Sequence, residues 1–168
     1  MHIKQKRADA VIGIFPADHL IVGAQKFSKS VRSAIQIATK KEALVTIGIQ
    51  PHYPATGYGY IQFNKKSADS HLNAFPVKTF AEKPHIKLAA RFLKSGDFLW
   101  NGGMFVWNVE SFFSEINLHM PQLSAQLMKI EKRIIEKKDF SRLWSRIDSE
   151  SIDYGLLEKT NNIYVIKA

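Results

Sequence analysis

The chain contains no cysteine, so disulfide bonds, thiolate metal sites and a cysteine nucleophile are excluded. It also has no apolar run close to the roughly 20 residues that a membrane-spanning helix needs. The basic N-terminal segment is followed by only a short apolar run and by no small-residue cleavage site, so it does not resemble a secretory signal peptide. These absences fit a cytoplasmic protein that has no membrane partner.

The composition predicts one globular domain of ordinary size over residues 1–168, with 45% hydrophobic and 23% charged residues. The formal net charge of +9 is compatible with a nucleic-acid partner or with an anionic small molecule. The positive residues between 129 and 138 are interleaved with Ile130, Ile134 and Ile135, as on the solvated face of an amphipathic helix. This dispersed charge argues against nucleic-acid binding. We keep nucleic-acid binding as a third hypothesis, which predicts that binding depends steeply on salt concentration.

Strand-like and helix-like segments alternate along the chain, which predicts an α/β protein with a mixed sheet flanked by helices. The expected strands are 10–15, 43–49, 58–63, 75–81 and 164–166. The expected helices are 25–40, 84–96, a helix that Asn108 caps and a longer helix after Pro121. The continuous apolar run Ala10–Phe15 is typical of a buried parallel strand. Because the chain opens and closes almost directly on strands, we expect the domain to be incomplete at both ends.

The most aromatic stretch, FLWNGGMFVW at residues 98–107, carries Asn101, Gly102 and Gly103 at its centre. Asn-Gly between apolar runs favours a β-hairpin, because both turn positions need a positive φ. The alternative is a ligand wall, in which the glycines allow close approach and Asn101 offers a donor and an acceptor. From the residues alone the hairpin is favoured, and both interpretations stay open.

Five motifs follow one another along nearly the whole chain. They are FPADHLI at 15–21, GIQP at 48–51 running on to PATGYGYI at 54–61, FAEKP at 80–84, LWNGGMF at 99–105 and IDYGLLEK at 152–159. In this order they resemble the central part of the mannose-1-phosphate guanylyltransferases, the GDP-mannose pyrophosphorylases of the sugar nucleotidyltransferase family. The resemblance implies a doubly wound α/β fold and a Mg²⁺-assisted reaction in which mannose 1-phosphate attacks the α-phosphorus of GTP, giving GDP-mannose and pyrophosphate.

The resemblance also implies residue roles. Asp18 would be the Mg²⁺ ligand and Lys83 the cation that meets the sugar phosphate, both in the catalytic machinery. The residues expected to bind the substrate are Thr56, Gly57, Tyr58, Gly59, Glu82, Asn101, Asp153 and Glu158. From the residues alone, a turn-capping role is favoured for Asp18, Glu82 and Lys83 could open a surface helix, and Gly59 could form a bulge. With the resemblance included, we favour the ligand wall over the hairpin for Asn101.

The chain departs from the family pattern in three places. It has no Gly-rich loop of the form GxGxRxxP to hold the GTP triphosphate, no second metal-binding aspartate after the last strand, and Gly102 where the family commonly has serine. We therefore expect the chain by itself to be a weak or inactive guanylyltransferase. The alternative hypothesis is a degenerate sugar-phosphate or nucleotide-sugar binding module that another chain completes. The sequence leaves homo-oligomer formation open.

Overall fold

A computed structural model describes the backbone of residues 1–168 and every side chain except that of Ser67. Its strands are β1 (Val11–Ile14), β2 (Leu44–Ile49), β3 (Tyr60–Phe63), β4 (Ala74–Ala81), β5 (Phe98–Asn108) and β6 (Ile163–Lys167). Its helices are α1 (His2–Lys6), α2 (Ala24–Lys41), α3 (Ile86–Ser95), α4 (Val109–His119), α5 (Pro121–Ile135) and α6 (Ser141–Trp144), with a 3₁₀ turn at Lys65–Ser67 and a π-helical turn, η2, at Asp153–Leu157. The predicted strands and helices are confirmed within a few residues at their ends.

The strands form one mixed sheet in the order β1-β5-β2-β6-β4-β3. Strand β3 also pairs with β5, so that β5, β2, β6, β4 and β3 close into a small barrel from which β1 extends. Only β2 and β6 pair in parallel, and every other pairing is antiparallel. The mixed α/β sheet was predicted, whereas its closure was not.

The expectation of a buried parallel strand at Ala10–Phe15 is wrong. Strand β1 runs antiparallel to β5, its one partner among the described strands, and Gly13 and Ile14 are exposed. A strand with a single neighbour can keep an apolar sequence while covering only one face of the sheet, because burial depends on what packs on it and not on its own composition.

The hairpin that the residues alone favour at Asn101-Gly102 is also wrong, because β5 runs without a turn from Phe98 to Asn108. The glycines instead form an irregularity in which residues 102–104 of β5 lie opposite the single residue Ile47 of β2. Gly103 has a φ of +63°, and a Cβ on Gly102 would lie 2.6 Å from the carbonyl oxygen of Ile47. The two glycines thus allow a bulge in a crowded strand.

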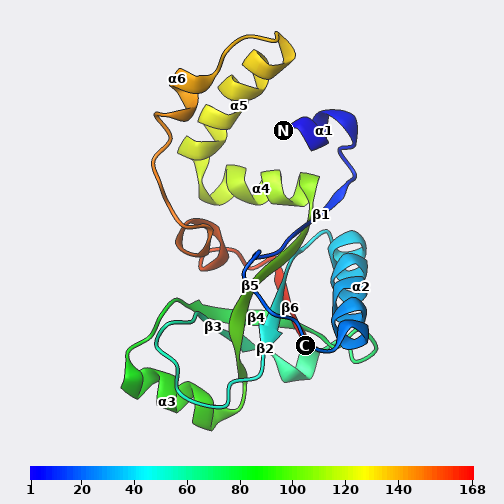
Figure 1. Cartoon of the computed structure of the whole chain (residues 1–168), viewed down its shortest axis with the longest axis vertical. Coiled ribbons are helices and arrows are strands. Elements are labelled where there is room, and N and C mark those ends of the chain that lie inside the picture. The colour runs from blue at the N-terminus through cyan, green and yellow to red at the C-terminus, as the bar shows by residue number, and fades with distance from the viewer.

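The helices cover the barrel from three sides (Figure 1). Helix α2 packs its buried Ala34, Ile37 and Ala38 against the sheet residues Val45 and Val106. Helix α3 covers the far end through Phe92, whose ring stacks on Phe98 at 3.9 Å between centroids. Helices α4 and η2 enclose the main core, in which Leu44, Ile61, Leu99, Leu156 and Val165 have no exposed surface.

Two helix ends were predicted from single residues. The side chain of Asn108 caps α4 by accepting hydrogen bonds from the backbone N–H groups of Glu110 and Ser111. Gly96 ends α3 in the left-handed conformation, with a φ of +70°. Both predictions are confirmed. Among the residues that the structure describes, no helix combines the length and the apolar character needed to cross a bilayer.

Candidate functional site

Asn101 sits at the centre of a hydrogen-bond network on the bulge of β5. Its Oδ1 accepts hydrogen bonds from the Thr46 hydroxyl and from the backbone N–H of Gly103, both at 3.1 Å. Its Nδ2 donates to Asp153 Oδ1 at 3.1 Å, so the network joins β2, β5 and η2. Three of the four hydrogen-bonding positions of the amide are used, which leaves one N–H for a ligand.

Glu82 and Lys83 follow β4 and lie beside this network. Lys83 Nζ is 3.1 Å from Glu82 Oε1, and the Glu82 side chain is only 9% exposed. The Glu82 backbone N–H donates to Glu158 Oε1 at 3.3 Å. Gly59 provides the room, because a Cβ there would lie 2.6 Å from Glu82 Oε2. Five of the residues predicted from the sequence (Gly59, Glu82, Lys83, Asn101 and Asp153) therefore lie together, with Glu158 at their edge.

Lys83 has an unusual backbone and an exposed, charged side chain. Its φ is +43°, in the left-handed region, although the residue before a proline normally adopts an extended conformation. Such a conformation costs about 1–3 kcal/mol and is typical of sites where function needs a particular side-chain direction. A hydrogen bond to Glu82 and its negative charge raise the pKa of Lys83 above its ordinary value. The side chain therefore carries a full positive charge at neutral pH.

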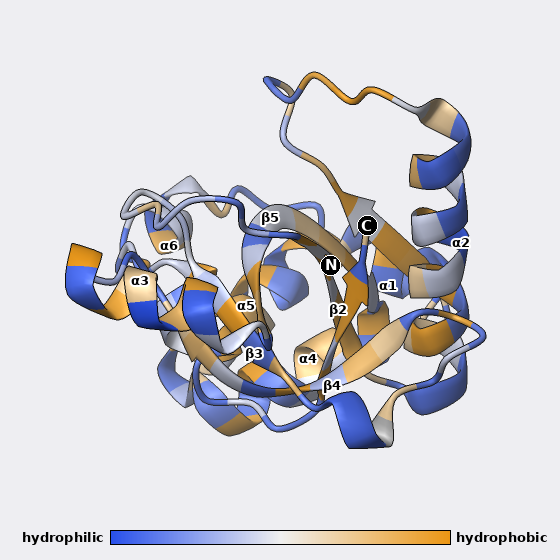
Figure 2. Cartoon of the chain, turned by 90° about the horizontal axis from the view of Figure 1, so that it is seen from below, coloured by the Kyte–Doolittle hydropathy of each residue, from blue (hydrophilic) through white to orange (hydrophobic). Residues whose placement is uncertain are grey.

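Asp18 lies on the long loop between β1 and α2, on the rim of a cavity of about 650 Å³. Asn101, Gly102, Gly103 and Tyr58 line the same cavity, so the structure brings Asp18 to the site of the network. Figure 2 shows this loop standing away from the sheet before α2, with an apolar segment at its crest. That segment is Leu20–Val22, in which Leu20 is 91% exposed.

The segment between β2 and β3 lines the cavity with only some of its predicted site residues. Tyr58 is half-exposed and lines the cavity, but Thr56 and Gly57 do not. Substrate binding by Thr56 and Gly57 stays a prediction. At Gly59 the carbonyl oxygen accepts a hydrogen bond from the Asn101 N–H at 2.8 Å, so this backbone supports β5.

An aromatic cluster that the sequence reasoning missed borders the cavity. The rings of His52, Tyr53 and Tyr58 contact the buried ring of Trp100, with centroids 4.9 to 5.1 Å apart. Trp100 and Tyr58 line the cavity, and the hydrogen bond that the Tyr53 hydroxyl makes to Tyr58 raises the pKa of Tyr53. The aromatic spacing within QPHYPATGYGY was the available signal. Thr46, a buried residue of β2, was also missed, because the hydrogen bond of its hydroxyl goes to Asn101, 55 positions away in the sequence.

The residues present offer a metal ion little besides Asp18. Among the described side chains, no three His, Asp or Glu residues gather as a metal-binding group. Asp18 is the one carboxylate side chain that lines the cavity. Mg²⁺ takes one or two protein carboxylates and fills its remaining positions with water and phosphate oxygens, so a single carboxylate is compatible with Mg²⁺ held jointly with a substrate.

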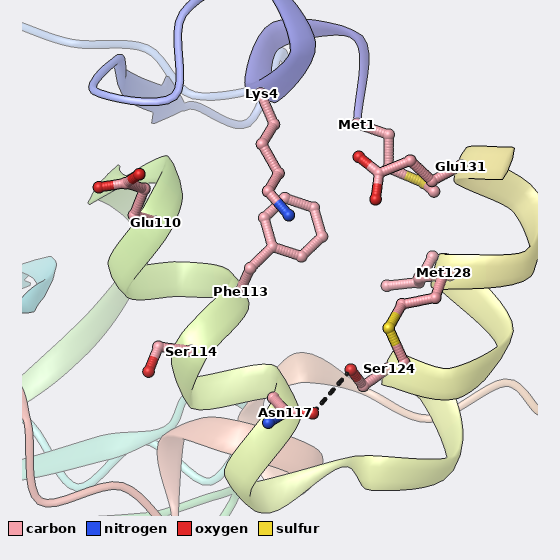
Figure 3. A pocket seen from close by; sticks show the side chains of 10 residues that line it. Met1, Lys4, Glu110, Phe113, Ser114, Asn117, Ser124, Met128 and Glu131 are labelled. Atoms are coloured by element: carbon pink, nitrogen blue, oxygen red, sulfur yellow. Dashed lines mark hydrogen bonds between the residues drawn. The ribbon is translucent and has the colours of Figure 1, made fainter. Parts of the chain in front are cut away.

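A separate hollow of about 380 Å³ lies between α1, α4 and α5 (Figure 3). Lys4 extends over the ring of Phe113, with Nζ 5.0 Å from the centroid, and Ser124 donates to Asn117 at 3.1 Å. None of the residues predicted from the motifs lines this hollow. The chemistry expected from the sequence therefore gathers at the barrel and not between these helices.

Comparison with known proteins identifies the family of the chain. The sequence pattern of the nucleotidyl transferase family matches residues 1–145 of the chain. The chain belongs to the nucleotidyl transferase family. Curated relatives include a mannose-1-phosphate guanylyltransferase of Escherichia coli, 35% identical over 98% of this chain and 36% of its own length. Another is the mannose-1-phosphate guanylyltransferase of Sinorhizobium fredii, 38% identical over 94% of this chain and 31% of its own length.

Solved structures support the fold. A mannose-1-phosphate geranyltransferase from Thermus thermophilus aligns with a TM-score of 0.85 at 23% identity, over 98% of this chain and 46% of that one. A mannose-6-phosphate isomerase from Helicobacter pylori aligns with a TM-score of 0.81 at 27% identity, over 99% of this chain and 64% of that one. As a nucleotidyl transferase family member, the chain spans about one third of the length of its curated relatives.

Proposed function

We propose that this chain supplies the sugar-phosphate side of a mannose-1-phosphate guanylyltransferase, within the doubly wound fold of the complete enzyme. The overall reaction would be GTP plus mannose 1-phosphate giving GDP-mannose and pyrophosphate. The observation that carries the proposal is the cluster of Glu82, Lys83, Asn101 and Asp153, in a chain whose relatives carry that name. Of these residues, Asn101 lines the cavity that Asp18 also lines.

The charges of this cluster suit a sugar phosphate. Glu82 and Asp153 accept hydrogen bonds only, which matches the hydroxyl donors of a neutral hexose ring. The Lys83 ammonium offers three donors and a compact charge to a phosphate. The Glu82–Lys83 pair at 3.1 Å would loosen as the phosphate takes the ammonium, while the buried Glu82 carboxylate keeps the lysine in place.

Asp18 would hold Mg²⁺ on the opposite rim. A carboxylate facing a phosphate repels it unless a cation lies between them, so Asp18 is better explained by a shared metal ion than by direct contact. When bound, Mg²⁺ would neutralise phosphate charge and orient the reacting oxygens. The chain's own contribution is to bind and orient the sugar phosphate, since catalysis of phosphoryl-type transfer depends mainly on positioning and electrostatics.

The test is calorimetric titration of the purified chain with mannose 1-phosphate, GDP-mannose and GTP, each with Mg²⁺. We expect the two mannose compounds to bind, GTP to bind weakly or not at all, and guanylyl transfer by the chain alone to be weak or absent. Lys83→Gln should weaken mannose 1-phosphate at least about tenfold, because a charge-assisted hydrogen bond contributes about 1.5–3 kcal/mol.

Lys87→Gln is the matched control, because Lys87 is an exposed lysine on the neighbouring helix α3 and does not touch the site residues named above. Its affinity for mannose 1-phosphate should stay within twofold of the unmodified chain. Absence of binding by both mannose compounds, or equal affinities for Lys83→Gln and Lys87→Gln, would overturn the proposal. Glucose 1-phosphate in the same series reports whether the site selects the hexose.

A further inference from the structure

A hollow of about 360 Å³ lies between α2, the segment before β4 and the end of β6, and its lining is basic. Lys26 and Lys29 reach it from α2, His71 from the loop before β4, and Lys167 from the end of β6. No Asp or Glu side chain lines it. Three ammonium groups around one small hollow create a positive potential that attracts anions.

Two serine hydroxyls form the floor of this hollow. Ser30 is 9% exposed and Ser33 is 6% exposed, and both side chains belong to the buried face of α2. Neither hydroxyl has a hydrogen-bond partner in the part of the chain that the structure describes, and neither is among its fully enclosed unpaired polar atoms, so both are open to the hollow. Both line the hollow, so each has a donor and an acceptor available to whatever occupies it.

The wall opposite α2 is held firmly. Asn73 adopts the left-handed conformation with a φ of +53°. Its Nδ2 donates to the carbonyl oxygen of Lys167 at 2.6 Å, and the Lys167 N–H donates to the Asn73 carbonyl oxygen at 3.2 Å. The start of β4 and the end of β6 are thereby tied together, which fixes the position from which Lys167 faces α2.

The hollow is continuous with the candidate cavity. Lys26 and Ser30 line both spaces, so a single face of α2 connects the surroundings of Asp18 with Ser33 and Lys29. The positions 26, 29, 30 and 33 recur at helical spacing and share this face. The lysines and serines at these positions therefore lie along one face of α2, next to the candidate cavity.

We propose that this hollow binds a phosphate-bearing anion, as inorganic pyrophosphate or as the phosphate groups of a nucleotide. The ammonium groups of Lys26, Lys29 and Lys167 supply the charge, and the hydroxyls of Ser30 and Ser33 donate to the oxyanion. The proposal goes beyond the function proposed above, which places the sugar phosphate at Lys83. A nucleic acid is disfavoured, because the basic groups surround one small hollow and do not form an extended stripe.

The experiment is a calorimetric titration of the purified chain with sodium pyrophosphate, without metal, at low and at moderate salt. The variants are Lys29→Gln and Ser33→Ala, the second of which removes one hydroxyl and favours the helix. Lys40→Gln is the control, because Lys40 is an exposed lysine on the same helix that lines neither space. We expect binding near or below about 1 mM, a loss of at least tenfold for Lys29→Gln, a loss of a few fold for Ser33→Ala, and a change within twofold for Lys40→Gln.

The outcomes separate this proposal from the other one. Lys83→Gln should leave pyrophosphate binding unchanged, so either proposal can fail alone. Displacement of pyrophosphate by GTP, lost in Lys29→Gln, would identify nucleotide phosphates as the ligand, and no displacement would identify the free anion. The proposal is overturned if pyrophosphate does not bind at millimolar concentration. It is equally overturned if Lys29→Gln and Lys40→Gln weaken binding alike, since that would indicate diffuse surface charge.

Discussion

Replacing Asn101 with alanine should destabilise the fold as well as the site. The amide makes three hydrogen bonds, to Thr46, Gly103 and Asp153, and the hydroxyl of Thr46 has no exposed surface. Each intramolecular hydrogen bond contributes about 0.5–1.5 kcal/mol. The buried Thr46 hydroxyl keeps a second acceptor in the carbonyl oxygen of Met104, 3.2 Å away, so the change does not leave it unpaired. We therefore expect Asn101→Ala to lower the free energy of unfolding by about 2–4 kcal/mol, a large part of the roughly 5–15 kcal/mol typical of a domain.

The assay is urea unfolding followed by circular dichroism and tryptophan fluorescence. Asn117→Ala is the control, because Asn117 also bonds one side chain, Ser124, but on the exposed surface of α4. That change should cost no more than about 0.5 kcal/mol. If Asn101→Ala unfolds at the same urea concentration as the unmodified chain while losing mannose 1-phosphate, the amide serves the ligand alone and the network reasoning is refuted.

Two further predictions concern the surroundings of the site. Gly59→Ala should displace the Glu82 carboxylate, which a Cβ would approach to 2.6 Å, and weaken binding of mannose 1-phosphate at least tenfold by calorimetry. An affinity equal to that of the unmodified chain would contradict this. Burial by itself raises the pKa of Asp97, but hydrogen bonds, including one from Gln62 at 2.8 Å, lower it overall. A pKa that is lower in the folded chain means that ionised Asp97 stabilises the fold. This stabilisation is present above the ordinary pKa of 3.8 and is lost as the pH falls through the lower pKa of the folded chain. Gln62→Leu should thus cost about 1–2 kcal/mol in urea unfolding at pH 7 and progressively less in acid; an equal cost at both pH values would refute the assignment.

Local patterns predicted most of the elements, because capping, turn chemistry and periodicity act over a few residues. The cap at Asn108, the stop at Gly96 and the helical face of α2 all depend on neighbours in sequence. The closure of the barrel does not, since it requires β3 to meet β5 across 35 residues or more. An apolar run does not indicate how many strands will pair with it. For this reason the environment of β1 was predicted wrongly.

The Asn-Gly signal shows how tertiary pairing overrides local preference. Strand β5 pairs with β1, β2 and β3, and a turn at Asn101 would break this set of ladders. The bulge keeps the ladders and still uses the glycines, because Gly102 has no room for a side chain. The prediction that Asn101 belongs to the site rested on resemblance, and the structure places Asn101 beside Asp153. The roles of Asn101 and of the other predicted site residues toward a ligand stay predictions.

The place of β6 in the sheet also has a consequence for the order of folding. The last strand along the chain inserts between β2 and β4, and its partner residues in β2, such as Leu44 opposite Ile163, are separated by most of the sequence. Contacts of such long range form slowly, since the chain entropy is lost before the pairing is gained. During synthesis β2 and β4 would have to wait with unpaired edges until residues 163–167 emerge, a period in which this chain is exposed to aggregation.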